Sequence, residues 1–242
     1  MRSTPIGILA AAAVLTAACG DDPAAPQNAF EVALTEDLAM VAADATLDDL
    51  AAMNDAVGGD GSTSTGGSFS RVVSFFDAAG NLQESFDPLT TDVVEVVVDA
   101  EREATRSGWV ATFQHHREFS ISGLAGEETT RTRNGAGQTE ITRSSHSDTG
   151  GDRSYEMSST SLIQDVVVGV PRAEFPWPLS GTITREIEAT ITTPDGVRTR
   201  QRTVVVDFNG TQFAEMTVNG ETFELDLDAR DFDRPFRRVG NR

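Results

Sequence analysis

Lysine is missing from this chain, and cysteine and histidine are rare. The 242 residues include one cysteine and 3 histidines, and all 19 basic residues are arginines. A lone cysteine, Cys19, excludes an intrachain disulfide framework and a cysteine zinc site, and without lysine there is no Walker-type phosphate loop. The 38 acidic residues give a formal net charge of −19, which opposes binding to the phosphates of nucleic acid.

The N-terminus has the pattern of an export signal. Arg2 is followed by an uncharged, alanine-rich run from Ile6 to Ala18. The run is shorter than the roughly 20 apolar residues that span a bilayer, and it is typical of the hydrophobic part of a secretory signal.

The residues that end this run resemble the lipobox of bacterial lipoprotein precursors. Leu15, Thr16, Ala17 and Ala18 precede Cys19, with Thr16 where the family usually has leucine. The resemblance implies a signal peptide over residues 1–18, cleavage before Cys19, acylation of its thiol and a lipid anchor in the bacterial cell envelope. Because Gly20 rather than aspartate follows the cysteine, the family's sorting rule implies the outer membrane.

The next segment is acidic and is expected to be partly helical. Residues 19–34, which include two prolines, are interpreted as the lipidated cysteine and a tether. Apolar residues at helical spacing over residues 35–57 predict two short amphipathic helices or one kinked helix, with Thr35 and Thr46 as N-caps. The acidic residues are interpreted as a solvated face. Residues 58–69 are rich in glycine, serine and threonine and predict a linker.

Residues 70–242 alternate between apolar and polar positions with period 2. This pattern predicts one mainly β domain, an antiparallel meander forming a half-barrel, a barrel or a sandwich. Asn-Gly pairs at Asn134-Gly135 and Asn219-Gly220 indicate hairpin turns. No strand–helix alternation is present, which excludes a parallel α/β fold. The arginine-rich tail, residues 230–242, is expected to be solvated.

A metal site is the sharpest enzymatic possibility. His116 and Glu118 share one face of a predicted strand, and His146 could add a third ligand of a facial metal site. We favour the simpler interpretation that these are surface residues, so no metal and no cofactor are predicted. His115 points to the opposite, aromatic face and is expected to be a hydrogen-bonded core residue.

An apolar cavity is a second possibility. Prolines flank Trp177 and hold residues 175–179 in a stiff, extended connection. In a half-barrel this connection could rim a cavity for an apolar ligand, but we favour the simpler interpretation that it plugs the open end of the sheet core. The candidate cavity residues are Trp109, Phe113, Phe119, Phe175 and Trp177.

These patterns leave three functional hypotheses. The first is a non-enzymatic binding or structural module of the cell envelope, attached to the membrane by its lipid and able to contact an envelope protein. The second is a carrier of an apolar ligand. The third, a metal-dependent enzyme, depends on His116, Glu118 and His146, and we expect the chain not to be an enzyme.

Overall fold

The computed structural model describes residues 25–55, 68–106, 109–145, 152–229 and 235–239. The predicted signal peptide, Cys19 and most of the linker lie outside these ranges, as does His146. The described residues form one helix, α1 (Ala25–Asp55), and an antiparallel sheet of 11 strands. The strands are β1 (Phe69–Asp77), β2 (Leu82–Gln83), β3 (Thr91–Arg106), β4 (Trp109–Ser122), β5 (Thr130–Ser145), β6 (Arg153–Gly169), β7 (Pro178–Thr193), β8 (Gly196–Asp207), β9 (Phe213–Val218), β10 (Glu221–Asp226) and β11 (Phe236–Arg238).

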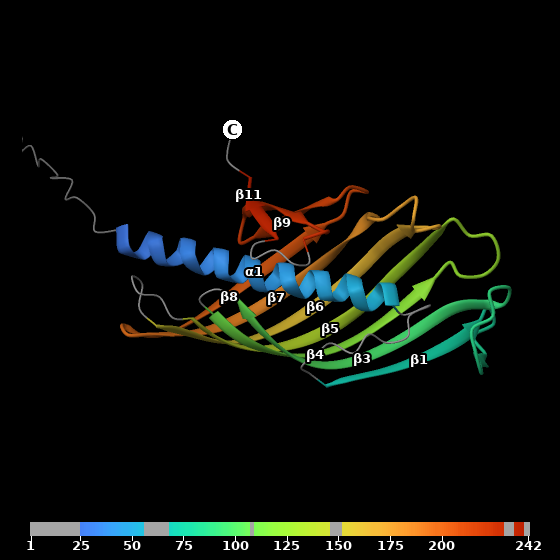
Figure 1. Ribbon diagram of the computed structural model, residues 1–242, viewed down its shortest axis with the longest axis horizontal. Helices are drawn as coiled ribbons and strands as arrows, with labels where there is room; N and C mark the ends of the chain where they lie inside the picture. Colours follow the sequence, from blue (N-terminus) through green and yellow to red (C-terminus); the bar gives the residue numbers. More distant parts are fainter. Residues whose placement is uncertain (1–24, 56–67, 107–108, 146–151, 230–234, 240–242) are drawn as a thin grey trace, which may run out of the picture.

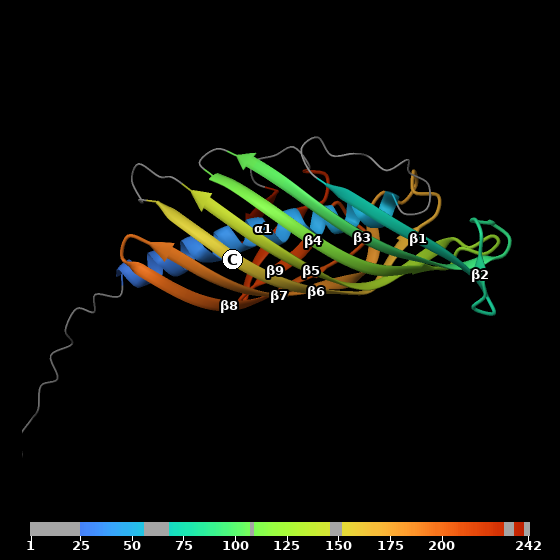
Figure 2. The same ribbon diagram turned by 90° about the horizontal axis from the view of Figure 1, so that it is seen from below.

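The sheet is a meander that curves around the helix. Its order is β11-β10-β9-β8-β7-β6-β5-β4-β3-β1-β2, so nearly every strand pairs with its neighbour in the chain. Figures 1 and 2 show α1 lying along the concave side, and β9 and β11 also contact it. The predicted mainly β, antiparallel meander is therefore confirmed, and the open, curved sheet corresponds to the half-barrel among the three alternatives.

The helical segment is longer than predicted and is continuous. It starts at Ala25, inside the expected tether. Pro26 is compatible with this start because it falls in the first turn, where its missing N–H breaks no helical hydrogen bond. Thr35 and Thr46 are not caps. Each hydroxyl donates instead to the carbonyl four residues earlier, of Glu31 at 2.9 Å and of Ala42 at 2.8 Å. Helical hydrogen bonds thus continue through both predicted boundaries.

The middle of α1 is enclosed on all sides. Every residue from Val41 to Thr46 is buried, as are Leu34, Leu38 and Met53. A helix buried all round belongs to the core of a protein rather than to its surface. The side chains of α1 and of the inner face of the sheet form one continuous hydrophobic core.

The strands separate charge between the two faces of the sheet. Inner positions alternate with outer ones along each strand, and the inner ones carry apolar residues and arginines. These arginines include Arg102, Arg117, Arg133, Arg143, Arg153, Arg185, Arg200 and Arg202. Exposed glutamates occupy outer positions of β3 to β7, namely Glu95, Glu101, Glu103, Glu118, Glu140, Glu156, Glu186 and Glu188. The concave face of this acidic protein is therefore basic.

The acidic residues of α1 neutralise this basic face. Asp49 is 1% exposed and pairs with both Arg117 and Arg185. The carboxylate of Asp48 lies 2.9 Å from the guanidinium of Arg102. Nearer the N-terminus of α1, the carboxylate of Asp37 lies 3.0 Å from the guanidinium of Arg143 and 3.8 Å from that of Arg153. It also accepts a hydrogen bond from the Tyr155 hydroxyl. Glu31 reaches Arg202 at 2.7 Å and Arg200 at 3.2 Å. The predicted solvated acidic face is thus wrong, because these acids are the counterions of the sheet.

Two of the predicted turns have different outcomes. Asn219-Gly220 joins β9 to β10 with positive φ angles of 50° and 83°, as a two-residue hairpin requires. Asn134-Gly135 instead lies inside β5, where the pairing with β6 shifts register. A Cβ at Gly135 would collide with Phe119, so this glycine allows β4 and β5 to approach closely. The expected turn is a β-bulge.

Part of the arginine-rich tail is ordered rather than solvated. Residues Phe236–Arg238 form β11, which pairs with β10. The guanidinium of Arg237 lies 2.5 Å from the carboxylate of Glu224, and that of Arg238 lies 2.6 Å from Glu221. These cross-strand pairs hold the end of the chain on the sheet.

Replacing Asp49 with asparagine should destabilise the protein by about 3–5 kcal/mol, because two buried guanidiniums lose their counterion. Urea unfolding followed by circular dichroism measures this free energy. Glu156→Gln is the matched control on the outer face, where the change should stay within about 0.5 kcal/mol. Equal effects of the two variants would contradict a structural role for the buried pairs.

Candidate functional site

The five predicted cavity residues divide into two groups. Trp109, Phe113 and Phe119 lie on the inner face of β4 and are buried in the core. The guanidinium of Arg143 lies 4.6 Å from the ring centroid of Trp109, and that of Arg102 lies 4.9 Å from that of Phe113. These three aromatic residues therefore support the helix–sheet packing and the stacked arginines.

Phe175 and Trp177 do line a cavity. Its volume is about 190 Å³, and it lies between the C-terminal half of α1 and the ends of β5, β6 and β7. Phe175 packs against Gly169, where a Cβ would collide with its ring. The complete lining is Leu47, Leu50, Asn54, Arg133, Val168, Arg172, Phe175, Pro176, Trp177, Pro178, Leu227 and Asp228. The structure thus brings two of the five predicted residues together around one space that apolar and polar side chains line.

Arg133 is the polar group that stands out in this cavity. It is 5% exposed, and its Nη1 donates to Oδ1 of Asn54 at 2.9 Å. Its Nε is buried and has no hydrogen-bond partner among the described residues. Burial, with the charges of Arg172 and Arg131 adding to it, lowers the pKa of Arg133 to about 10. The guanidinium remains charged at neutral pH in a place that gives it little compensation.

A second polar cluster surrounds Asp49 and is the most strongly buried set of charges. Burial raises the pKa of Asp49, but the guanidiniums of Arg185 and Arg117 outweigh it and hold the pKa below its ordinary value. Burial has the opposite outcome at Asp48, where it raises the pKa more than Arg102 and Arg117 lower it. Neighbouring carboxyl groups therefore differ in proton affinity because only Asp49 lies between two arginines.

His115 completes this cluster as a neutral core residue, which confirms the expectation from its face on β4. Its Nδ1 lies 3.0 Å from the Thr139 hydroxyl and 3.3 Å from a guanidinium nitrogen of Arg117. Since a guanidinium only donates, Nδ1 accepts and the proton sits on Nε2, which lies 4.0 Å from a carboxylate oxygen of Asp48. Burial, followed by the charge of Arg117, lowers the pKa of His115 to about 3.

Two of the three predicted metal-site candidates, His116 and Glu118, lie on the opposite face of the same strand. Nε2 of His116 is 3.4 Å from Oε1 of Glu118, and its Nδ1 is 2.8 Å from Oδ1 of Asp99. All three side chains are well exposed, and the hydrogen bond that His116 donates to Asp99 raises the pKa of His116. No set of three metal-ligating side chains converges among the residues that the structure describes. His116 is therefore a surface histidine held between two carboxylates.

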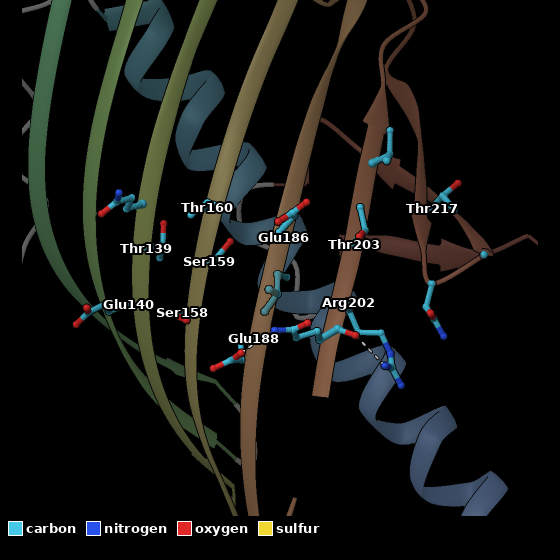
Figure 3. Close-up of a pocket in the computed structure, with 16 residues that line it drawn as sticks. Thr139, Glu140, Ser158, Ser159, Thr160, Glu186, Glu188, Arg202, Thr203 and Thr217 are labelled. Carbon is cyan, nitrogen blue, oxygen red and sulfur yellow. Dashed lines mark hydrogen bonds between the residues drawn. The ribbon is translucent and has the colours of Figure 1, made fainter. Parts of the chain in front are cut away.

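A broad groove of about 770 Å³ lies on the outer face of β5 to β8 (Figure 3). Hydroxyl and carboxylate side chains such as Ser158, Thr160 and Glu186 line it, while α1 lies on the other side of the strands. Gln201 donates to Glu188 across β7 and β8 at 2.8 Å. This arrangement is typical of the wet face of a sheet, and it places no nucleophile beside a buried base.

The sequence analysis missed the inner arginines. Arg117 lies between His115 and Phe119 on one face of β4, and Arg185 lies between Ile183 and Ile187 on β7. Both arginines therefore occupy positions in the alternating pattern that otherwise hold apolar residues. This position in the sequence indicates a buried charge that needs a partner.

Comparison with protein-family models, with curated proteins and with solved structures finds no match for this chain. The described part of the chain contains no helix that is both long and apolar enough to cross a bilayer.

The two adjacent histidines predict opposite effects of pH on stability. The folded pKa of His115 is about 3 against 6.5 for the free residue, so below pH 6.5 the unfolded chain binds a proton that the native chain does not. Its contribution to stability is lost as pH falls, by about 1.5 kcal/mol between pH 6.5 and 5. Urea unfolding across this range should show a smaller loss in His115→Gln than in the unmodified protein.

His116→Gln is the control for this measurement. The raised pKa of His116 makes its protonation favour the folded state below its unfolded pKa, and that contribution disappears as pH rises through the folded pKa. His116→Gln should therefore keep the His115-dependent loss. A His115→Gln profile parallel to that of the unmodified protein would show that His115 is not held neutral.

Proposed function

We propose that the protein is a bacterial envelope lipoprotein, anchored through Cys19, whose folded body acts as a non-enzymatic binding or structural module. The observation that carries the proposal is the occupation of the concave face by α1. Small-molecule and active sites are usually concave pockets, and here a helix of the same chain occupies the concave face of the sheet through ion pairs at Glu31, Asp37, Asp48 and Asp49.

The same helix supports a close connection between anchor and body. Ala25 begins α1 six positions after Cys19, and six residues extend over about 20 Å at most. Because α1 is part of the core, this connection leads directly into the sheet. The proposed lipid would thus hold the module close to the membrane surface.

The cavity beside Phe175 and Trp177 favours a second candidate function, a carrier of a small apolar ligand. Its volume of about 190 Å³ exceeds the roughly 150 Å³ that accommodates benzene in an engineered apolar cavity. This candidate differs from the first only in requiring a resident or exchangeable ligand.

Cys19→Ser should abolish labelling by palmitate and release the chain from the membrane fraction, because the proposed anchor forms on the thiol. The measurement is metabolic labelling with fractionation in a bacterium that processes lipoproteins. Thr16→Leu, which introduces the residue usual at that lipobox position, is the matched control and should keep both properties. A Cys19→Ser protein that remains lipid-labelled and membrane-bound would contradict the anchor.

The released Cys19→Ser protein separates the two candidate functions. Native mass spectrometry of this chain, purified without added ligand, should give the bare polypeptide mass if it is a module without a resident ligand. A co-purifying mass of one small organic molecule would favour the carrier.

A further inference from the structure

Seven inner arginines share one arrangement, and Arg133 departs from it. Each of the seven pairs with a carboxylate of α1. They are Arg102, Arg117, Arg143, Arg153, Arg185, Arg200 and Arg202. Arg133 faces the amide of Asn54 instead, and it has no carboxylate partner among the described residues. The counterion pattern of these arginines therefore does not extend to Arg133, which lies in the cavity lined by Phe175 and Trp177.

The unfilled position has the chemistry of a carboxylate site. A guanidinium has five N–H donors in a planar fork, and that of Arg133 donates one of them to Asn54 at 2.9 Å. Its buried Nε has no acceptor among the described residues, but the same is true of the Nε of Arg102, Arg143, Arg153, Arg185 and Arg202. The feature that sets Arg133 apart is therefore the lack of a carboxylate partner among the described residues. A carboxylate oxygen pair matches such a fork better than any neutral group does.

Most of the other residues that line the cavity are apolar and favour an apolar body for the ligand. They include Leu47, Leu50, Val168, Phe175 and Trp177, while Asn54, Arg172 and Asp228 are the remaining polar side chains of the lining. Its volume of about 190 Å³ is the size of a single aromatic ring or an acyl chain of medium length. A free inorganic anion would leave this apolar surface uncovered.

We propose that this cavity binds a small monocarboxylate with an apolar body, a medium-chain fatty acid or a single-ring aromatic acid, whose carboxylate is held by Arg133. This inference rests on the carrier candidate described above. The ligand takes at Arg133 the place that an aspartate or glutamate of α1 takes at the seven paired arginines.

Two probe molecules distinguish binding of an apolar chain in the cavity from binding of a carboxylate to Arg133. Octanoate and 1-octanol share an apolar chain, and only octanoate carries the carboxylate. Isothermal titration of the Cys19→Ser chain should show both binding, with octanoate the tighter. Arg133→Met should weaken octanoate at least about tenfold and leave octanol nearly unchanged, because the carboxylate would be buried without its partner. Arg237→Met, which removes the same charge from an exposed strand, should change neither affinity.

A second variant tests the site without removing the arginine. Asn54→Asp places a carboxylate beside Arg133, where it should fold normally and compete with octanoate but not with octanol. It serves as the test if Arg133→Met does not fold.

Three results would overturn the proposal. Binding of neither probe would reject the carrier candidate together with this inference. Equal affinity for octanoate and octanol, or unchanged octanoate binding by Arg133→Met and Asn54→Asp, would leave the cavity but reject the role of Arg133. An equal loss in Arg237→Met would reduce the effect to net charge.

Discussion

The structure depends on the placement of Asp49 between Arg117 and Arg185. Each of these groups is almost fully buried, and none would be stable there alone, since removing a charge from water costs several kcal/mol unless a partner compensates. The concave face of the sheet and the helix therefore require one another. A sheet with inward arginines needs counterions, and a helix rich in alanine and acids needs a surface against which to fold. Residues 136 positions apart thereby become direct neighbours.

This mutual requirement also shapes the functional surfaces. Acids along α1 neutralise the concave face from Arg200 and Arg202 to Arg117, but the pattern stops at Asn54, opposite Arg133. The cavity lies where helix and sheet no longer complement each other in charge. A module fixed by its own helix, with one small site at the end of that helix, accounts for both features. The outer face, with its exposed glutamates, remains a polar surface.

The fold class was predictable because alternation with period 2 and the absence of strand–helix units leave few architectures. The helix was predictable in existence but not in extent, because Thr35 and Thr46 are good caps whose hydroxyls bond equally well within a helix. The arginines on apolar faces, such as Arg185 between Ile183 and Ile187, indicated buried charge. Which acid would meet which arginine was not predictable, because helix and sheet meet only in three dimensions. Phe175 and Trp177 line a small cavity at the end of α1, but its role as a ligand site and the anchor at Cys19 stay predictions.

Hydrogen–deuterium exchange tests most directly whether α1 belongs to the core. If its ion pairs and apolar contacts bind it into the sheet, the amides of Val41 to Asp49 should exchange only on global unfolding, as slowly as the central strands β4 to β7. Exchange from these residues orders of magnitude faster than from those strands would contradict this account. It would show a helix that leaves the concave face while the sheet stays folded.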